Sequence, residues 1–158
     1  WANGGNKVAT GENSITPASF KTKLNKKYFA SFSEVQKAQK GKGQQCLIDA
    51  RPAAFFTGDK KHAKARIPGR LANARNLQEG NLIDDSFKMK PSSAIKSQFG
   101  GLDGVEQYKG YISYCNTGHW AATVWFGLSE IAQIPNVKMY DGGMTHWTSN
   151  PKRKVDLG

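Results

Sequence analysis

The sequence predicts an α/β fold with a mainly parallel sheet. Three short apolar runs have the length and composition of buried strands: residues 45–49, 111–114 and 137–140. A segment with helical periodicity, residues 119–133, lies between the last two of them. The chain has 158 residues, 38% of them hydrophobic, which suits a single domain. Strands that alternate with helices are typical of a parallel sheet covered by helices.

The first third of the chain is predicted to contain an arm, a helix and a buried strand. Residues 1–13 are rich in Gly, Asn and Thr and indicate a linker or irregular arm. Residues 19–27 predict a short strand, although their alternation is poor. Residues 33–40 predict a polar helix with Ser31 or Ser33 as its N-cap. The glycines at 41 and 43 end that helix, and the strand at 45–49 follows.

The middle of the chain has weaker signals. Residues 52–56 predict a short helical turn that begins with a proline, and residues 67–69 (Ile-Pro-Gly) predict a turn. Residues 76–85 are too mixed to assign. Residues 92–99 predict a helix, because Pro91 stands at its start and two glycines follow its end.

The last third of the chain has the clearest pattern. The strand at 111–114 runs directly into Cys115. Apolar residues then recur at helical spacing to residue 133, and Pro135 stops the helix. The strand at 137–140 is followed by a turn, Asp141-Gly142-Gly143, and the tail at 151–158 is charged.

The chain is strongly basic, with a net charge of +11. Such an excess attracts anions, and both nucleic acids and small anionic substrates are candidates. One dense basic stretch stands out: Lys60, Lys61, His62, Lys64, Arg66, Arg70 and Arg75. We interpret His62 as a surface residue of this stretch. Because no nucleic-acid-binding motif accompanies it, we expect no specific nucleic-acid partner.

Neither a membrane span nor a signal peptide is visible in the sequence. No apolar run approaches the roughly 18 residues of a membrane helix. A signal peptide removed earlier would leave no trace. We favour the bacterial periplasm as the compartment, with the cytoplasm, which suits a free cysteine, as the alternative.

Of the two cysteines, only Cys115 has the surroundings of a nucleophile. Two cysteines without further ligands at metal spacing predict no zinc site, and a disulfide is possible on their number alone. Cys46 lies inside a strand and is interpreted as a small core residue. Cys115 stands at the carboxyl end of a strand, before a loop with Gly118 and the start of a helix. Backbone N–H groups converge at such a place and favour a thiolate or a bound anion.

Four segments resemble, in the same order, the rhodanese homology domain of the sulfurtransferase family. They are Leu47-Ile48-Asp49-Ala50-Arg51, Arg66-Ile67-Pro68-Gly69, Tyr114-Cys115-Asn116-Thr117-Gly118-His119-Trp120-Ala121 and Tyr140-Asp141-Gly142-Gly143-Met144-Thr145-His146-Trp147. The resemblance covers roughly residues 14–150.

The resemblance implies a three-layer α/β/α fold around a parallel sheet of about five strands. It implies that Cys115 takes a sulfane sulfur from a small anionic donor such as thiosulfate and passes it, as a persulfide, to cyanide or a thiol. The loop from Asn116 to Ala121 (Asn116, Thr117, Gly118, His119, Trp120 and Ala121) would bind the substrate through its backbone amides. Arg51 and Arg66 would support the site, and no metal or organic cofactor is implied.

This chain departs from the family pattern at several basic positions. Many members have Arg where Trp120 stands. Enzymes that use thiosulfate have basic side chains where Asn116 and Gly118 stand, and an Arg where Phe55 stands. The physiological donor therefore stays open, and a protonated His119 can supply the missing charge in the loop.

Two other functions compete with sulfur transfer. A phosphatase or arsenate reductase with a cysteine loop needs an arginine to clamp its oxyanion, and residues 115–121 contain none. A non-catalytic rhodanese-like module that binds a partner or senses sulfide or redox state is the alternative that we keep.

The two ends of the chain resemble each other. Each reads Trp, a polar stretch, Val, two residues and Gly, from Trp1 to Gly11 and from Trp147 to Gly158. A tandem protein divided between its repeats has this appearance. We therefore hypothesise that residues 14–150 are the catalytic domain of one half of a longer chain with a second rhodanese-like domain, flanked here by the arm at 1–13 and the tail at 151–158.

Overall fold

The computed structural model describes residues 1–157 and contains one parallel sheet. Its strand order is β2-β1-β3-β4. The first strand of the chain is therefore a central strand, and the later strands are added on both sides of it. The strands are β1 (Gln45–Asp49), β2 (Ala74–Asn76), β3 (Gly110–Tyr114) and β4 (Val137–Tyr140). All four run in the same direction, so their carboxyl ends lie along one edge of the sheet.

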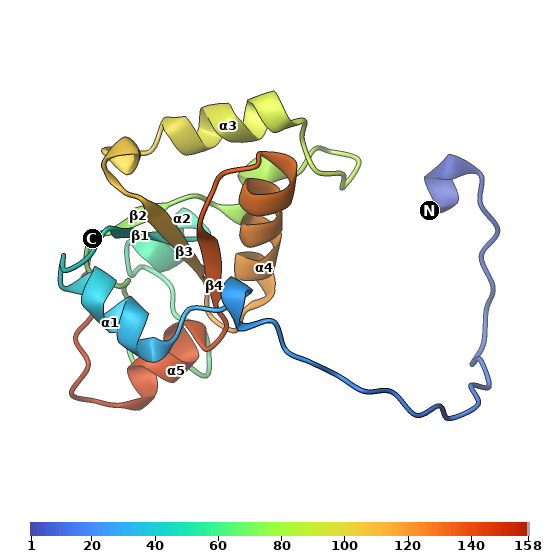
Figure 1. Ribbon diagram of the computed structural model, residues 1–158. Coiled ribbons are helices and arrows are strands. Elements are labelled where there is room, and N and C mark those ends of the chain that lie inside the picture. The colour runs from blue at the N-terminus through green and yellow to red at the C-terminus, as the bar shows by residue number, and fades with distance from the viewer. Residues whose placement is uncertain (158) are drawn as a thin grey trace.

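Helices cover both faces of the sheet, as the three-layer prediction requires (Figure 1). The layer on one face has α1 (Phe32–Gln39) and α5 (Gly143–Ser149). The opposite layer has α3 (Ser92–Gly100) and α4 (His119–Phe126). Shorter helical segments connect these elements: η1 (Ala2–Gly4), η2 (Lys26–Tyr28), α2 (Ala53–Phe56), η3 (Glu79–Leu82), η4 (Val105–Gln107) and the π-helical turn η5 (Gly127–Ile131).

Two hydrophobic clusters, one on each face, explain why the strands are apolar throughout. Leu47 packs with the side chains of α1 and α5, whereas its neighbour Ile48 packs with those of α3 and α4. Alternation along a strand sends successive side chains to opposite faces. Because both faces are covered, both positions must be apolar, and β1 reads as a continuous apolar run.

The start of α1 confirms Ser31 as the N-cap. Its hydroxyl accepts a hydrogen bond from the Glu34 N–H, and the Glu34 carboxylate accepts one from the Ser31 N–H at 2.8 Å. This capping box satisfies two N–H groups at the helix start. Burial alone would raise the pKa of Glu34, but hydrogen bonds from Lys138, at 2.6 Å, and from Ser31 lower it to about 2.

The helix expected at 119–133 is confirmed, with a change of pitch. The α-helix ends at Phe126 and continues as η5 to Ile131. Gly127 allows the close approach of the neighbouring segment, since a Cβ there would lie 2.8 Å from Met89 Cε. The Trp125 indole donates to the carbonyl of Val137 at 3.2 Å, which attaches α4 to β4.

The strand expected at residues 19–27 is wrong. That segment is exposed and irregular, and only its end turns into η2. Just after this segment, Phe29 forms a single parallel bridge with Met139 of β4. The Ala30 N–H also donates a hydrogen bond to the Met139 carbonyl. The sheet therefore has four strands rather than about five, because one bridge does not make a strand.

Three further elements had no clear signal in the sequence. β2 has only three residues, and α5 begins inside the segment expected to be a turn. The unassigned stretch 76–85 contains the end of β2 and η3. Each of these elements is defined by contacts with distant segments rather than by its own periodicity.

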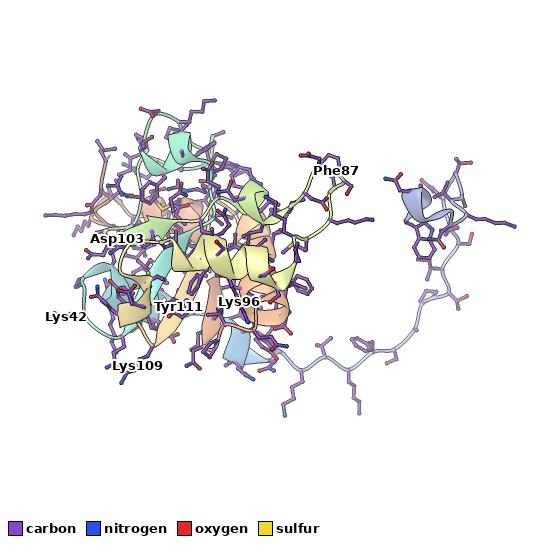
Figure 2. The ribbon with its side chains drawn as sticks, turned by 90° about the horizontal axis from the view of Figure 1, so that it is seen from above. Lys42, Phe87, Lys96, Asp103, Lys109 and Tyr111 are labelled. Carbon is purple, nitrogen blue, oxygen red and sulfur yellow. The ribbon has the colours of Figure 1, made fainter. Side chains whose placement is uncertain are left out.

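The N-terminal arm lies apart from the body of the molecule (Figure 1). Every residue from 1 to 27 is exposed. In the body, Lys42, Lys96 and Lys109 extend outward, and Phe87 lies at the tip of a projecting loop (Figure 2). The charged tail folds back on the domain, where Asp156 exchanges two backbone hydrogen bonds with Arg70. Gly158, the last residue of that tail, lies outside the described residues.

No helix within residues 1–157 combines the length and the apolar character needed to cross a membrane.

Candidate active site

Cys115 directly follows β3 at the edge where the parallel strands end. The residue is 1% exposed, yet it lines a cavity of about 290 Å³. The other residues of this cavity, which we call the cysteine cavity, are His62, Asn116, Thr117, His119 and Trp120. Ligands of parallel α/β sheets bind at this edge, outside the carboxyl ends of the strands.

The loop after Cys115 brings a backbone N–H to its sulfur. The Gly118 N–H donates to Cys115 Sγ at 3.1 Å. Gly118 has a φ of 96°, and a Cβ there would lie 2.6 Å from Asp141 Oδ1. Only glycine suits both conditions, so this residue allows the sharp return of the chain to the sulfur. The first N–H groups of α4, which begins at His119 directly after this loop, have no carbonyl one turn back within the helix.

Backbone N–H groups of helix α5 donate hydrogen bonds to the carbonyls at the start of the loop. The Met144 N–H donates to the Cys115 carbonyl at 2.8 Å, and the Thr145 N–H donates to the Asn116 carbonyl at 3.2 Å. In a trans peptide, the carbonyl and the following N–H point in opposite directions. The N–H groups of Asn116 and Thr117 therefore point away from α5.

Gly143 permits this contact between α5 and the loop. Its φ is 54°, and a Cβ there would lie 2.5 Å from the Cys115 oxygen and 2.6 Å from the Asn116 oxygen. The second glycine of the Asp-Gly-Gly segment is therefore required, because it lets α5 pack against the cysteine loop.

The Asn116 side chain has a buried donor without a partner in the described part of the chain. It is 2% exposed, and its Oδ1 accepts from Arg51 Nη1 at 3.4 Å. Because Arg51 can only donate, the oxygen must face it and the NH₂ group must face away. Asn116 Nδ2 has no hydrogen-bond partner among residues 1–157. A buried donor without a partner is costly, so a turn of the Asn116 side chain that brought this donor to a ligand in the cavity would be stabilised.

Arg51 lies behind Asn116 rather than in the cavity wall. It forms a buried ion pair with Asp49, with 2.6 Å between Nη2 and Oδ2, and Nη2 also donates to the Gly69 carbonyl at 2.9 Å. Burial alone would lower the pKa of Arg51, but the hydrogen bonds and charge of Asp49 raise it above its ordinary value. Arg51 is therefore a fixed cation that orients Asn116.

The two histidines enter the cavity from different segments. His119 is exposed, and its Nδ1 lies 3.3 Å from Thr117 Oγ1. His62 lies on the loop between α2 and β2, and its Nδ1 accepts from the Lys64 N–H at 3.2 Å. A neutral His62 therefore has its proton on Nε2. His62 was expected only on the surface; no local signal indicated that its loop folds over the cysteine.

Trp120 and Phe55 form an aromatic wall beside the site. Their ring centroids are 6.0 Å apart in an edge-to-face arrangement. These are two of the positions at which the family pattern has arginines, so the sequence departures meet in space. Ala121 is buried beneath the loop, where its carbonyl accepts from the Ser113 hydroxyl at 3.0 Å.

Arg66 and Cys46 also lie outside the cysteine cavity. Arg66 is exposed, and only its backbone N–H is engaged, with Thr148 Oγ1 at 3.1 Å. Cys46 is buried within β1, and burial raises its pKa to about 11. Both cysteines are free, and residues 1–157 contain no cluster of His, Cys, Asp and Glu that could hold a metal.

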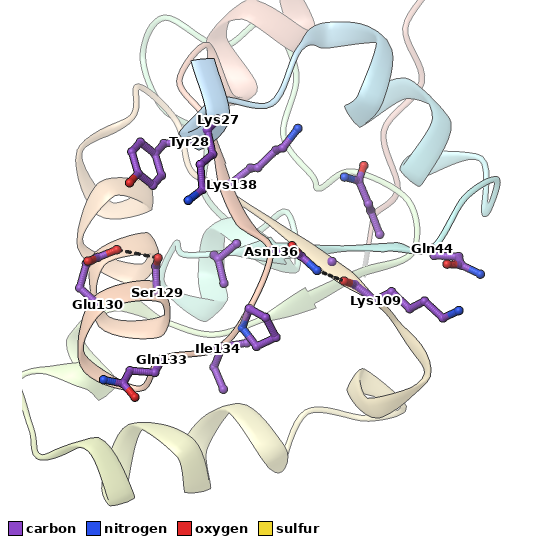
Figure 3. Close-up of a pocket in the computed structure, with 14 residues that line it drawn as sticks. Lys27, Tyr28, Gln44, Lys109, Ser129, Glu130, Gln133, Ile134, Asn136 and Lys138 are labelled. Atoms are coloured by element: carbon purple, nitrogen blue, oxygen red, sulfur yellow. Dashed lines mark hydrogen bonds between the residues drawn. The ribbon is translucent and has the colours of Figure 1, made fainter. Parts of the chain in front are cut away.

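A larger cavity, of about 660 Å³, lies at the opposite end of the sheet (Figure 3). The first residues of three strands line it, Gln45, Gly110 and Val137, together with polar side chains such as Lys109 and Glu130. Cys115 does not reach it. Size alone therefore does not identify the reactive site of this molecule.

Comparison with known proteins shows the family and the fold of the chain. Residues 31–150 match the family model of the rhodanese-like domain. The chain belongs to this family. The 3-mercaptopyruvate sulfurtransferase of Escherichia coli K12 is 31% identical over 111 residues, which are 70% of this chain and 38% of that protein. The SseB protein of Mycobacterium tuberculosis, provisionally named a thiosulfate sulfurtransferase, is 26% identical over 100% of this chain and 54% of its own length.

Solved structures share the fold of this rhodanese-like domain. The Tum1 protein of Saccharomyces cerevisiae superimposes with a TM-score of 0.66 and 23% identity, over 82% of this chain and 47% of that one. An anaerobic ergothioneine biosynthesis enzyme of Chlorobium limicola gives a TM-score of 0.73 with 18% identity, over 84% and 32% of the two chains. The chain spans about half the length, or less, of the curated relatives it matches.

Proposed function

We propose that this rhodanese-like domain transfers a sulfane sulfur through a persulfide on Cys115. The observation that carries the proposal is the Gly118 N–H at 3.1 Å from Cys115 Sγ, in a loop whose carbonyls are turned away by α5. N–H groups directed at the sulfur favour the thiolate and any anion that forms on it.

In the first half-reaction, the Cys115 thiolate attacks the outer sulfur of thiosulfate. The new bond joins Sγ to that sulfur, the bond between the two sulfurs of thiosulfate breaks, and sulfite leaves with the electron pair. The backbone N–H groups of the loop, beginning with that of Gly118, stabilise the negative charge beside Cys115.

In the second half-reaction, an acceptor takes the outer sulfur. A thiolate or cyanide attacks it, the bond to Sγ breaks, and the electron pair returns to Cys115. The sulfur passes as a sulfane sulfur, so no oxidant or reductant is consumed. The product is a persulfide or thiocyanate.

The cavity favours a singly charged donor over thiosulfate. No lysine or arginine lines it, and its polar groups are Asn116, Thr117 and the two histidines. A monoanion such as 3-mercaptopyruvate needs less compensating charge than the thiosulfate dianion. With this donor the carbon–sulfur bond breaks when the Cys115 thiolate attacks the sulfur, and pyruvate leaves with the electron pair as its enolate, which then takes up a proton. We therefore expect kcat/KM to be higher for 3-mercaptopyruvate, with cyanide as the common acceptor.

The test is the intact mass of the chain after incubation with each donor. A gain of one sulfur, about 32 Da, is expected for a covalent intermediate. Cys115→Ser should show no gain, whereas the matched variant Cys46→Ala should gain the sulfur as the wild type does. A wild type that gains nothing with either donor and produces no thiocyanate would instead favour the non-catalytic module.

We also propose that the whole protein has a second rhodanese-like domain, with residues 14–150 as the catalytic unit of the part described here. The support is that the chain spans about half the length of its curated relatives. The sequence of the parent gene tests this: a start codon immediately before Trp1 would contradict it.

A further inference from the structure

A second, smaller cavity adjoins the cysteine cavity across Trp120. Its volume is about 210 Å³, and Trp120 lines both cavities. The remaining residues of this cavity, which we call the distal cavity, are Ala50, Pro52, Gln78, Glu79, Gly80 and Asn81. They follow β1 or belong to the segment around η3, so the distal cavity also lies at the edge where the strands end.

Trp120, the residue that lines both cavities, packs against an aromatic neighbour. Phe55 packs edge-to-face on Trp120 at 6.0 Å between ring centroids. The segment on the far side of the distal cavity is also held in place, because the Glu79 N–H donates to the Ala50 carbonyl at 3.0 Å and Gln78 Oε1 accepts from the Ala53 N–H at 3.1 Å. The distal cavity is thus formed by ordered elements.

Two features of the distal cavity favour a cation. The Glu79 carboxylate has no cationic partner among residues 1–157, and no lysine or arginine lines the cavity. An indole is the aromatic group that attracts cations best, and Trp120 presents one there. The cysteine cavity has the opposite character, with two imidazoles and no carboxylate among its lining residues.

We propose that the distal cavity is a subsite for the ammonium group of an aminothiol acceptor, which places its thiol beside the Cys115 persulfide. This inference rests on the proposed function. The acceptor thiolate attacks the outer sulfur, the bond between that sulfur and Cys115 Sγ breaks, and the electron pair stays on Sγ. The product is the persulfide of the aminothiol, and the ammonium group does not change.

The test compares thiols that differ only in their charged end. Cysteamine is paired with 2-mercaptoethanol, and 3-aminopropanethiol with 3-mercaptopropanol, with the sulfur donor held constant. For each pair, the measured quantity is the ratio of kcat/KM for the aminothiol to kcat/KM for the hydroxythiol. Comparing this ratio between variants cancels the intrinsic reactivity of the thiols.

We expect Glu79→Gln to lower this ratio about fivefold for at least one chain length, as for loss of a partly exposed ion pair. Trp120→Leu should lower it too, since it removes the aromatic face. The exposed Glu106→Gln is the matched control and should leave the ratio at the wild-type value. Equal ratios in wild type, Glu79→Gln and Trp120→Leu would overturn the subsite.

The cyanide assay separates the two possible failures. Thiocyanate formation by the wild type with unchanged ratios in the variants would refute the subsite alone. No thiocyanate and no sulfur adduct would refute the proposed function, and the subsite with it.

Discussion

The Arg51–Asp49 ion pair gives the sharpest prediction about stability. Asp49 is fully buried and Arg51 is 2% exposed. Three hydrogen bonds from the Arg51 guanidinium reach the carboxylate, at 2.6 to 3.1 Å, and the same group binds the Gly69 carbonyl and Asn116 Oδ1. The variant Arg51→Met keeps much of the side-chain volume but removes every one of these donors.

Removal of Arg51 leaves a carboxylate in the core without its partner. Loss of one member of a buried pair costs about 4 kcal/mol, because the remaining charge is uncompensated. For a chain of this length, that free energy corresponds to a fall in Tm of roughly 10 °C. We expect urea unfolding at neutral pH, followed by circular dichroism, to show the loss in the free energy of unfolding.

Two further variants make this prediction specific. Arg66→Met removes an exposed arginine whose side chain has no hydrogen bond or ion pair within residues 1–157, so its effect should stay within about 0.5 kcal/mol. The double variant Asp49→Asn/Arg51→Met removes the buried charge and should recover part of the loss. If Arg51→Met is as stable as Arg66→Met, the reasoning about the buried pair is refuted.

Three other predictions concern a glycine, a thiol and a carboxylate. Gly143→Ala should destabilise the domain by at least about 2 kcal/mol and slow sulfur transfer, because a left-handed backbone and a close approach to the loop oxygens both exclude a Cβ; Gly100→Ala, whose Cβ would meet open space, is the matched control, and equal stability of the two would contradict the contact. In Cys115→Ser, alkylation of Cys46 at pH 8 should be roughly a hundredfold slower than in the unfolded chain, since its pKa is raised to about 11; comparable rates would show that this thiol is accessible and ionised. The pKa of Glu34 is lowered from 4.5 to about 2, so its contribution to stability is present above pH 4.5 and is lost as the pH falls towards 2. The wild type should therefore exceed Glu34→Gln in the free energy of unfolding by a constant amount, about 1 kcal/mol, near neutral pH, with a difference that shrinks below pH 4.5; a difference that does not depend on pH would refute this assignment.

The departures from the family pattern are related to one another in the structure. Phe55 and Trp120 stand where many relatives have arginines, and the two rings pack together. A pair of arginines at these positions would place two cations close together, whereas a pair of aromatic rings gains apolar contact. The site therefore has an apolar wall in place of positive charge, and we expect this difference to change which donors and acceptors it prefers.

Local pattern was sufficient for three of the four strands, β1, β3 and β4, and for the helices α1, α3 and α4. The apolar runs at 45–49 and 137–140 match β1 and β4 in the structure, and the capping signal at Ser31 marks the start of α1. The buried residues of each of these elements form an apolar run or recur at helical spacing, so the sequence alone indicates the element. The strand expected at 19–27 was wrong because β-forming residues there have no covered face to pack against.

By itself, the sequence determined the α/β class, the position of Cys115 after a buried strand and the four segments that resemble the family. The tertiary structure alone decided how those segments meet: that α5 turns the loop carbonyls away from the cavity, that Asn116 has a buried N–H without a partner among the described residues, and that the His62 loop reaches the cysteine. The physical reason is that burial leaves a periodic trace along one segment, whereas a hydrogen bond between segments tens of residues apart depends on strand order and leaves none.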